Sequence, residues 1–340
     1  MTNICKDLLS QGALYELEPG YVRSEVGLAA EHWGALAVRL EAGSVAVAIV
    51  DHQGKTYGIW RNPFDRSTKP SAMVKIMAGV VAEALEGAAA SSFPRLAGIG
   101  VSVPGMVNPN KGVCLSAVNL DHWENVPVGQ MLVEWLPDGA PGIVIENDAV
   151  AALLANRWFL EGGTSVDDVL YFSVGEGVGC AQLAGGHINR GRNFAAGEIG
   201  CLPAGKEGRP CRCGKVDCLQ VYCSEAGVAE TLAMGEEVAS YCEDIDATKE
   251  HALTKALSPL VREIHSMVAL ADPEEVLLGS RVGALTNAAV STVRRSLEER
   301  MGPGTVLPVI RSALPLDDAS LRGAAVAVFQ KAFETEDLAI

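Results

Sequence analysis

The chain has 340 residues, a formal net charge of -15, a pI of about 4.9 and a mean hydropathy of +0.19. This length allows roughly two domains, each with enough apolar residues for a core that needs no disulfide bond. The acidic surface would repel nucleic acid overall unless a basic patch were segregated from it, and none is evident in the sequence.

Targeting and membrane signals are absent from the sequence pattern. No apolar run reaches the roughly 18 residues needed to span a bilayer, and residues 1–12 are polar, without the apolar region of a secretory signal peptide. We therefore expect a cytoplasmic protein without a membrane partner, in a compartment where thiols stay reduced.

Strands and helices alternate along the first half of the chain. Residues 35–60 predict two or three β-strands with turns at Ala42-Gly43 and Gln53-Gly54, and residues 71–90 predict a helix from their 3.6-residue apolar period. The run LAGIGVSVPG, 96–105, predicts an apolar strand ending in a Pro-Gly turn. The run GIVIENDAVAALLANRW, 142–158, predicts a strand that leads into a helix.

The second half repeats the opening pattern and then becomes mainly helical. Residues 167–191 read as strand, glycine-rich turn, strand and Gly-Gly turn, which indicates a weak internal duplication. Residues 272–280 predict a strand among helices, and residues 321–333 predict a final helix that packs back on the first lobe. The alternation favours an α/β protein with two similar lobes, divided as 1–30, 31–147 plus 318–340, and 148–317.

Four of the nine cysteines lie within eighteen residues, in CLPAGKEGRPCRCGKVDC. Cys211, Cys213 and Cys218 form a tight loop in which Gly214 lets the backbone turn, and Cys201 completes a set of four. Four sulfurs suit tetrahedral zinc with no coordination position left for water, so we predict a structural zinc loop at 201–218. The alternative is a set of unrelated buried or disulfide-bonded cysteines.

Several segments, in order, resemble the ROK family of repressors, open reading frames and sugar kinases. AAGEIGCLPAGKEGRPCRCGKVDCLQ resembles the family's zinc signature, GVSVPGMVN its P-G-x-V-D segment, IENDAVAALLAN its N-D helix start, and SVGEGVGCAQLAGG its G-T-G-I-G stretch. The likeness extends from about residue 34 to 335. It implies a two-lobed, actin-like (ribonuclease-H-like) ATPase fold with a sugar bound in the cleft between the lobes.

The same resemblance implies the sugar-binding residues. Asn147, Asp148 and Glu198 would hydrogen-bond the sugar hydroxyls beside the Gly105 turn, and Asp148 would be the general base if a phosphoryl group is transferred. The local alternatives are a helix N-cap for Asn147-Asp148 and a solvated loop acid for Glu198.

Two positions at the sugar and zinc sites depart from the family pattern. The family's metal-binding His is Cys201 here, and its Glu after the last cysteine is Gln220, which exchanges a carboxylate for an amide at the sugar. Residues 119–128 resemble a family loop near the sugar, although Trp123 could equally serve packing.

The nucleotide side departs further from the sugar kinases of the family. Arg39 stands where they have a magnesium-binding Asp, and Glu41 and Glu176 place carboxylates where phosphates would bind, so we expect ATP and magnesium binding to be lost. A register error of one or two residues in the first loop is the alternative. The residues assigned to these degenerate loops are Arg39, Glu41, Gly43, Ser44, Gly175, Glu176, Gly177 and Gly279.

Residues 2–17 resemble the end of a winged helix-turn-helix, with a recognition helix and a short wing strand, but the two preceding helices are missing and an ordinary N-terminal helix is the alternative. DNA binding is therefore possible only through an incomplete module.

Three hypotheses for the function compete. The preferred one is a regulator-type sensor of a sugar or sugar phosphate, assembled as a dimer or tetramer like its family; the others are an ATP-dependent glucokinase or N-acetylhexosamine kinase and a degenerate interaction protein.

Overall fold

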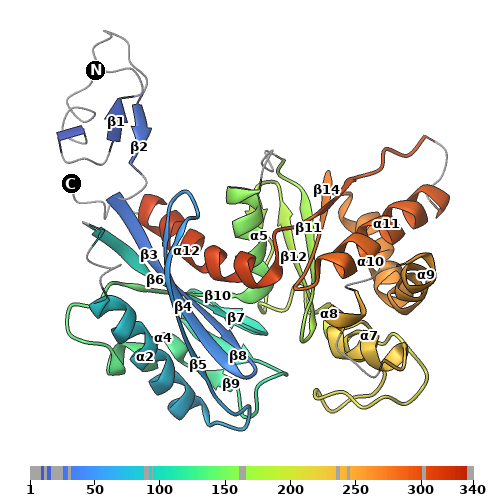
Figure 1. Ribbon diagram of the computed structural model, residues 1–340, viewed down its shortest axis with the longest axis horizontal. Coiled ribbons are helices and arrows are strands. Elements are labelled where there is room, and N and C mark those ends of the chain that lie inside the picture. Colours follow the sequence, from blue (N-terminus) through green and yellow to red (C-terminus); the bar gives the residue numbers. More distant parts are fainter. Residues whose placement is uncertain are drawn as a thin grey trace.

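The computed structural model describes residues 9–10, 14–16, 26–29, 32–87, 92–93, 95–160, 166–234, 238–242, 246–300 and 304–334. Its body consists of two lobes, each built on a five-stranded mixed sheet, with the helices α5 (Asp148–Phe159) and α12 (Leu316–Glu334) between the sheets (Figure 1). The α/β class expected from the sequence is what the structure shows.

The first sheet lies in the N-terminal lobe. Its strands in spatial order are β10 (Ile143–Asn147), β6 (Arg95–Val103), β3 (Trp33–Glu41), β4 (Ser44–Asp51) and β5 (Thr56–Pro63). The hairpins β3–β4 and β4–β5 are antiparallel, as the two predicted turns require, whereas β3, β6 and β10 run parallel. β3 and β4 are buried along nearly their whole length, because helices cover both faces of the sheet.

One face of this sheet is covered by α2 (Pro70–Glu86), which packs on β4 and β5 and against α4 (Val128–Trp135). Pro70 at the start of α2 suits a first turn, because proline lacks only an N–H that would have no partner there. A small antiparallel sheet of β7 (Met106–Asn108), β8 (Val113–Ser116) and β9 (Glu124–Val126) closes the lobe.

The second sheet repeats the topology of the first. Its strands in spatial order are β13 (His187–Ile188), β12 (Val178–Ala184), β11 (Val169–Val174), β14 (Glu275–Ser280) and β15 (Val309–Ser312). β11, β12 and β13 form an antiparallel meander, and β14 and β15 add to β11 in parallel. The shared strand order and directions agree with the internal duplication that the sequence indicated.

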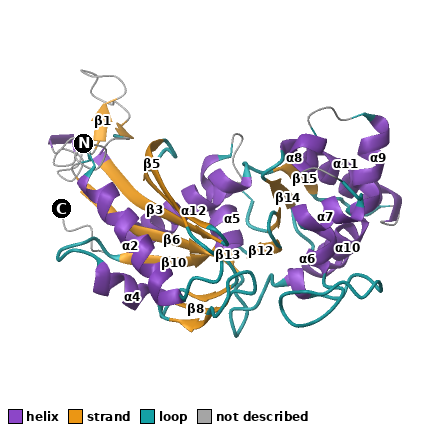
Figure 2. Cartoon of the chain, turned by 60° about the horizontal axis from the view of Figure 1, so that its bottom comes forward, coloured by secondary structure: helices purple, strands orange, loops and turns teal. Residues whose placement is uncertain are grey.

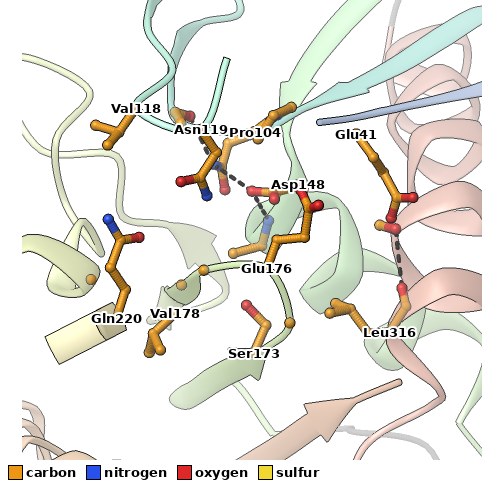
Figure 3. A pocket seen from close by; sticks show the side chains of 18 of the residues that line it. Glu41, Pro104, Val118, Asn119, Asp148, Ser173, Glu176, Val178, Gln220 and Leu316 are labelled. Atoms are coloured by element: carbon orange, nitrogen blue, oxygen red, sulfur yellow. Dashed lines mark hydrogen bonds between the residues drawn. The ribbon is translucent and has the colours of Figure 1, made fainter. Parts of the chain in front are cut away.

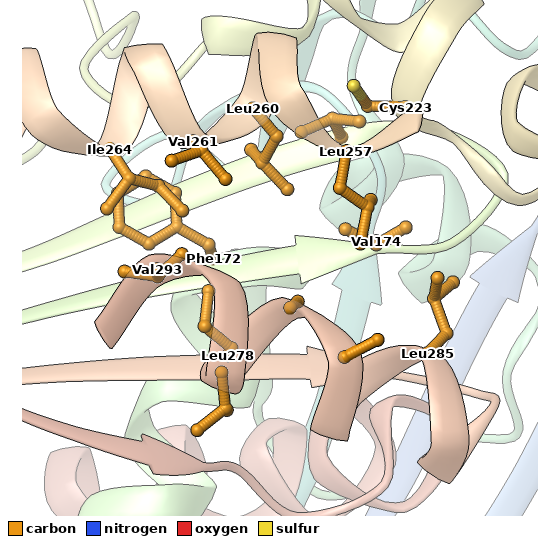
Figure 4. Packing of buried hydrophobic residues seen from close by; sticks show 14 of the residues in the cluster. Phe172, Val174, Cys223, Leu257, Leu260, Val261, Ile264, Leu278, Leu285 and Val293 are labelled. Carbon is orange, nitrogen blue, oxygen red and sulfur yellow. The ribbon is translucent and has the colours of Figure 1, made fainter. Parts of the chain in front are cut away.

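The α-helices between β13 and β15 in the sequence gather on the side of the second sheet that faces away from the first lobe (Figure 2). A core around Phe172, Leu278 and Leu260 joins these helices to β11 and β14 (Figure 4). The helices are α6 (Leu219–Cys223), α7 (Glu225–Thr231), α8 (Val238–Tyr241), α9 (Ala247–Ala256), α10 (Ser258–Ala271) and α11 (Gly283–Arg300).

Helices α5 and α12 cross in close contact where the lobes meet. A Cβ on Gly323 of α12 would lie 1.7 Å from the Ala151 carbonyl oxygen of α5, and one on Gly100 of β6 would lie 1.9 Å from the Ala324 oxygen. The two glycines therefore set how near α12 comes to its neighbours. This contact confirms the prediction that the final helix packs back on the first lobe.

The N-terminal segment contributes a two-stranded antiparallel sheet of β1 (Leu14–Glu16) and β2 (Val26–Leu28). β1 agrees with the expected wing strand, whereas most of the expected recognition helix lies outside the described residues. The division of the chain into three segments stays a prediction. Within the described ranges, every helix is too short or too polar to cross a bilayer.

Candidate functional site

A pocket lies between the two lobes. The first lobe contributes residues 39–42, 104–105, 118–119 and 147–149, and the second contributes residues within 173–180 and 197–201 together with Gln220 and Arg281. Leu316 and Ser320 of α12 complete the lining. In the view of Figure 3, Gln220 lies at one end of the pocket, Asp148 in the middle and Glu41 at the other end.

Asn147 and Asp148 lie where β10 ends and α5 begins. Asn147 Oδ1 accepts a hydrogen bond from Val150 N at 2.9 Å, so Asn147 is indeed the helix N-cap. Its Nδ2 donates to the Gly105 carbonyl oxygen at 2.8 Å and to Asp148 Oδ1 at 3.0 Å. Asp148 Oδ1 also accepts from Ala149 N at 2.9 Å. These contacts hold Asp148 Oδ1 and fix the carboxylate in the pocket.

Two carboxyl groups in this pocket have raised pKa values. Burial raises the pKa of Asp148 from 3.8 to about 6, and the charge of Glu41 adds to the rise. Desolvation by the surrounding protein, followed by the charge of Asp148, raises the pKa of Glu198 from 4.5 to about 7. The Glu198 side chain still contacts solvent within the cleft, so the desolvation of Glu198 is incomplete. Both groups can exchange a proton near neutral pH.

The backbone around these carboxylates depends on two glycines. Gly105 has φ +85°, and a Cβ there would lie 2.2 Å from the Ser116 carbonyl oxygen. Gly197, directly before Glu198, has φ +89°, and a Cβ there would lie 2.0 Å from the Cys180 oxygen. The structure thus brings Gly105, Asn147, Asp148 and Glu198 to one pocket, as the sequence analysis expected.

Gln220 and Asn119 add two amides to the pocket, at the end opposite Glu41 (Figure 3). The carbonyl oxygen of Gln220 faces Gly177, whose added Cβ would lie 3.2 Å from it and 3.0 Å from Asn119 Nδ2. Asn119 was not singled out from the sequence, although it belongs to the segment that resembles a family loop. Trp123 in that segment is only 1% exposed, so it serves packing.

The four clustered cysteines converge. Their Sγ atoms all lie within 4.8 Å of one another, in a loop where Gly214 adopts the expected positive φ of +83°. A tetrahedral zinc ion with Zn–S bonds of about 2.3 Å would place the sulfurs about 3.8 Å apart, so the four cysteines fit such an ion. The described cysteines are all free thiols, which excludes a disulfide pairing among them. Gln220 Nε2 donates to Cys211 Sγ at 3.0 Å and connects this loop to the pocket.

The end of the pocket around Glu41 holds a set of ion pairs, called here the ion-pair cluster. Glu41 contacts Arg39 at 3.4 Å and Arg281 at 2.8 Å. Asp317 contacts Arg39 at 2.7 Å and Arg281 at 2.9 Å, and Arg281 reaches Glu225 at 3.6 Å. Each of these carboxylates therefore has a cationic partner.

Glu176 completes the cluster from the turn between β11 and β12. Its Oε1 pairs with Arg66 at 2.7 Å, and its Oε2 accepts a hydrogen bond from Ala42 N at 3.3 Å. The sequence predicts carboxylates at Glu41 and Glu176 where phosphates would bind, and the structure adds that arginines distant in the sequence pair with both of them. The members of the ion-pair cluster are Arg39, Glu41, Arg66, Glu176, Glu225, Arg281 and Asp317.

The other residues assigned to nucleotide loops divide into two groups. Gly175 and Gly177 line the pocket on either side of Glu176. Gly43 lies in the β3–β4 turn and Ser44 begins β4, both outside the pocket lining, and Gly279 lies within β14 next to the Tyr171 hydroxyl. The structure therefore does not bring all of the expected loop positions to the pocket.

A further ion pair lies behind Asn147 and Asp148. Glu146 on β10 is 3% exposed, and its Oε1 accepts a hydrogen bond from Asn147 N at 2.9 Å. Its Oε2 pairs with Arg190, which follows β13 in the second lobe. Burial raises the pKa of Glu146, and Arg190 opposes that rise. The pair connects the strand that carries Asn147 to the loop that leads to Glu198.

Comparison with known proteins agrees with this site. The sequence matches the ROK family over residues 35–331. The chain belongs to the ROK family. It is 28% identical over 225 residues to a xylose repressor of Caldicellulosiruptor bescii, covering 60% of this chain and 55% of the repressor. It is also 30% identical over 193 residues to a glucokinase of Halalkalibacterium halodurans, covering 56% of this chain and 57% of the kinase. The ROK protein thus aligns with little more than half the length of these curated relatives.

Solved structures of ROK proteins share the fold. A ROK family transcriptional regulator, a homologue of the E. coli MLC protein, superposes with a TM-score of 0.78 at 19% identity, covering 98% of this chain and 90% of that one. A ROK glucokinase from Streptomyces griseus, in complex with glucose and AMPPNP, gives a TM-score of 0.74 at 22% identity, covering 87% and 99%. The expected two-lobed actin-like fold is confirmed.

Proposed function

We propose that this ROK protein is a regulator-type sensor core that binds a sugar or sugar phosphate between its lobes and transfers no phosphoryl group. The observation that carries the proposal is the ion-pair cluster. Its members Arg39, Glu41, Glu176 and Arg281 line the cleft that also contains Asp148, and a phosphoryl donor would have to pass these ion pairs to approach a sugar held by Asn147 and Asp148.

The other end of the cleft has the chemistry of a carbohydrate site. Asn119 offers an amide donor and acceptor, and Gln220 offers its carbonyl oxygen, since its Nε2 donates to Cys211. Asn147 donates both Nδ2 hydrogens to Gly105 and Asp148, so toward a sugar it offers only the second lone pair of Oδ1. Asp148 and Glu198 offer carboxylates that accept hydrogen bonds from hydroxyl groups. A few polar groups that converge in a cleft are typical of sites for small polar ligands. The likeness to xylose repressors and to a structurally characterised ROK regulator supports the regulator assignment.

Calorimetry against D-xylose, D-glucose, glucose 6-phosphate and ATP tests this function. We expect at least one sugar to bind and ATP not to bind, and we expect Asp148→Asn to abolish sugar binding because the carboxylate is lost. Sugar-dependent ATP hydrolysis that disappears in Asp148→Asn would overturn the assignment.

A sugar kinase is the second candidate function, and one observation favours it. Asp148 lies at the start of α5 with a pKa of about 6, a value that suits a general base for a sugar hydroxyl. The relation to glucokinases and β-glucoside kinases supports the same candidate. This activity would require ATP and magnesium, and both would have to displace the ion-pair cluster.

The cysteine cluster is proposed to hold one structural zinc ion. Cys201, Cys211, Cys213 and Cys218 supply four sulfur ligands and leave no coordination position for water. Zinc bound there would stabilise the loop 201–218 and, through Gln220, the wall of the sugar pocket.

Lobe closure around the sugar is proposed to be the signal passed to a partner. DNA is one possible partner, through the segment that includes β1 and β2, and a second copy of the chain in a dimer or tetramer is another. Light scattering after gel filtration, with and without the sugar found by calorimetry, measures the assembly.

A further inference from the structure

The ion-pair cluster connects the two lobes at several points. Glu41 ends β3 in the first lobe and pairs with Arg281, which follows β14 in the second. Arg66, in the segment between β5 and α2, pairs with Glu176 in the β11–β12 turn of the other lobe. The same turn is tied to β3 by the hydrogen bond from Ala42 N to Glu176 Oε2. In each of these contacts, a residue of the first lobe pairs with a residue of the second lobe across the cleft.

The pairing of charges in the cluster makes the binding of an anionic ligand unfavourable. Three arginines face four carboxylates, and each arginine has at least one carboxylate within 3.4 Å. The neighbouring Asp148 and Glu198 add negative charge when they ionise. A phosphate that entered would have to take an arginine from its present partner and then face the freed carboxylate, and like charges at short range repel.

We propose that the ion-pair cluster, through Glu41, Arg66, Glu176 and Arg281, joins the lobes and restricts the cleft to an uncharged sugar. The part that concerns the sugar rests on the proposed function, whereas the joining of the lobes and the exclusion of phosphate groups do not. The ion pairs of the cluster hold the two lobes together, as a polyphosphate anion in contact with both lobes would.

The first experiment uses inorganic tripolyphosphate as the probe and needs no sugar. In Glu41→Gln/Glu176→Gln the two carboxylates become amides of similar shape, so Arg66 and Arg281 each lose a partner and can bind an anion. We expect tripolyphosphate to bind the wild type too weakly for calorimetry to detect at low ionic strength. The double variant should bind measurably, with an affinity at least about tenfold above that detection limit, because removal of two carboxylates takes away about 1 kcal/mol of repulsion or more.

The control is Asp167→Asn/Glu207→Gln, which removes two carboxylates from ion pairs outside the cleft, with Arg157 and Arg209. This control variant should bind tripolyphosphate as weakly as the wild type does. Circular dichroism checks that each variant is folded. Equal titration curves for the wild type and Glu41→Gln/Glu176→Gln, whether both bind or neither binds, would overturn the proposed exclusion of phosphates.

A thermal double-mutant cycle tests the joining of the lobes. Glu41→Gln and Arg281→Gln should each lower the melting temperature, and the double variant should lose less than the two shifts combined, with the difference shrinking in high salt. Strictly additive shifts at low salt would show that Glu41 and Arg281 do not couple the lobes.

The third measurement concerns the sugar alone. Calorimetry should show that the wild type binds D-glucose, D-xylose or N-acetyl-D-mannosamine, and that glucose 6-phosphate binds at least about tenfold more weakly than the best of these. Preferential binding of glucose 6-phosphate would overturn the restriction to uncharged sugars. If no sugar or sugar phosphate binds while the tripolyphosphate result holds, the proposed sensor function fails and the exclusion of phosphates stands.

Discussion

At the scale of single residues, Asp148 shows how local structure and burial together set the chemistry of a group. Its position at the first turn of α5 and its hydrogen bonds with Asn147 and Ala149 favour the ionised form. Burial and the charge of Glu41 favour the protonated form and outweigh them, which brings the pKa to about 6. The protein therefore keeps a carboxyl group whose charge is unfavourable for folding.

This imbalance predicts a pH-dependent effect of Asp148→Asn on stability. Because the folded pKa lies above the unfolded value of 3.8, the native state binds the extra proton between about pH 4 and 6, and wild-type stability falls as pH rises through that window. Asn cannot ionise, so the variant should gain about 1–3 kcal/mol relative to the wild type between pH 4 and 7.5. Urea unfolding followed by tryptophan fluorescence measures the free energy of unfolding of both proteins at each pH.

Asp65→Asn is a control with the opposite sign. The hydrogen bonds from Ser67 hold the pKa of Asp65 below its usual value. This carboxylate therefore stabilises the fold at neutral pH and loses its effect as pH falls through the folded pKa. If the free energies of Asp148→Asn and the wild type stayed parallel from pH 4 to 7.5, burial would not be what raises the pKa of Asp148.

The cysteine cluster gives a second prediction at the residue scale. Purified protein should contain about one zinc ion per chain, and Cys213→Ser should lose most of it because a tetrahedral site then lacks a ligand. Mass spectrometry of the metal content measures this. Cys242→Ser, at a buried free thiol outside the cluster, should keep the metal. A metal-free wild type with the melting temperature of a zinc-treated sample would contradict the prediction.

At the scale of the element, the crossing of α5 and α12 determines how the lobes are joined. Gly323 lets the α12 backbone approach the Ala151 carbonyl of α5, and backbone atoms cannot move aside as a flexible side chain can. Gly323→Ala should therefore destabilise the protein by about 1–3 kcal/mol through overpacking, although alanine favours helix. Denaturant unfolding measures this loss.

Gly79→Ala is the matched control, because Gly79 lies inside α2 with open space around its Cα. There the substitution should stabilise the protein by about 0.5–1 kcal/mol, since alanine has less conformational freedom to lose than glycine. Stabilisation of similar size in both variants would mean that α12 does not lie against α5 as described.

The elements also show what the sequence could predict. The turns at Ala42-Gly43 and Gln53-Gly54, the strand leading to Asn147 and the final helix follow from local patterns, and the structure has each of them. Asn147, Asp148 and the cysteines stood out because adjacent or closely spaced residues carry the signal. The pairing of Glu41 with Arg281 joins residues 240 positions apart, and the pairing of Glu176 with Arg66 spans 110. No local sequence pattern indicates contacts over such separations, so the sequence alone does not reveal the partners of Glu41 and Glu176.

At the scale of the whole molecule, two separate sets of ion pairs join the lobes. One is the ion-pair cluster, and the other is the pair of Glu146, directly before Asn147, with Arg190. A chain with a net charge of -15 has an excess of carboxylates, so an arginine that crosses between lobes relieves repulsion as well as forming a contact. The two pairings differ in burial, since the Glu146 side chain is 5% exposed and the Glu41 side chain 23%.

Burial makes the Glu146–Arg190 pair the more sensitive to removal of one partner. Arg190→Gln leaves a buried carboxylate without its cation, which should lower stability by about 2–4 kcal/mol at pH 8. Without Arg190 the pKa of Glu146 rises further, so the native state of the variant takes up a proton as pH falls. The loss should therefore be smaller at pH 5, where the protonated carboxyl is neutral.

The second substitution separates charge from packing. Adding Glu146→Gln to Arg190→Gln removes the unpaired charge, so the double variant should regain much of the lost stability at pH 8 and lose the dependence on pH. Because the Glu146 carboxylate accepts the Asn147 N–H, sugar affinity should drop in Arg190→Gln and recover in part in the double variant. A loss in Arg190→Gln that is the same at pH 5 and pH 8 and is not relieved by Glu146→Gln would mean that Arg190 acts by packing, and that the charges of Glu146 and Arg190 do not couple the lobes.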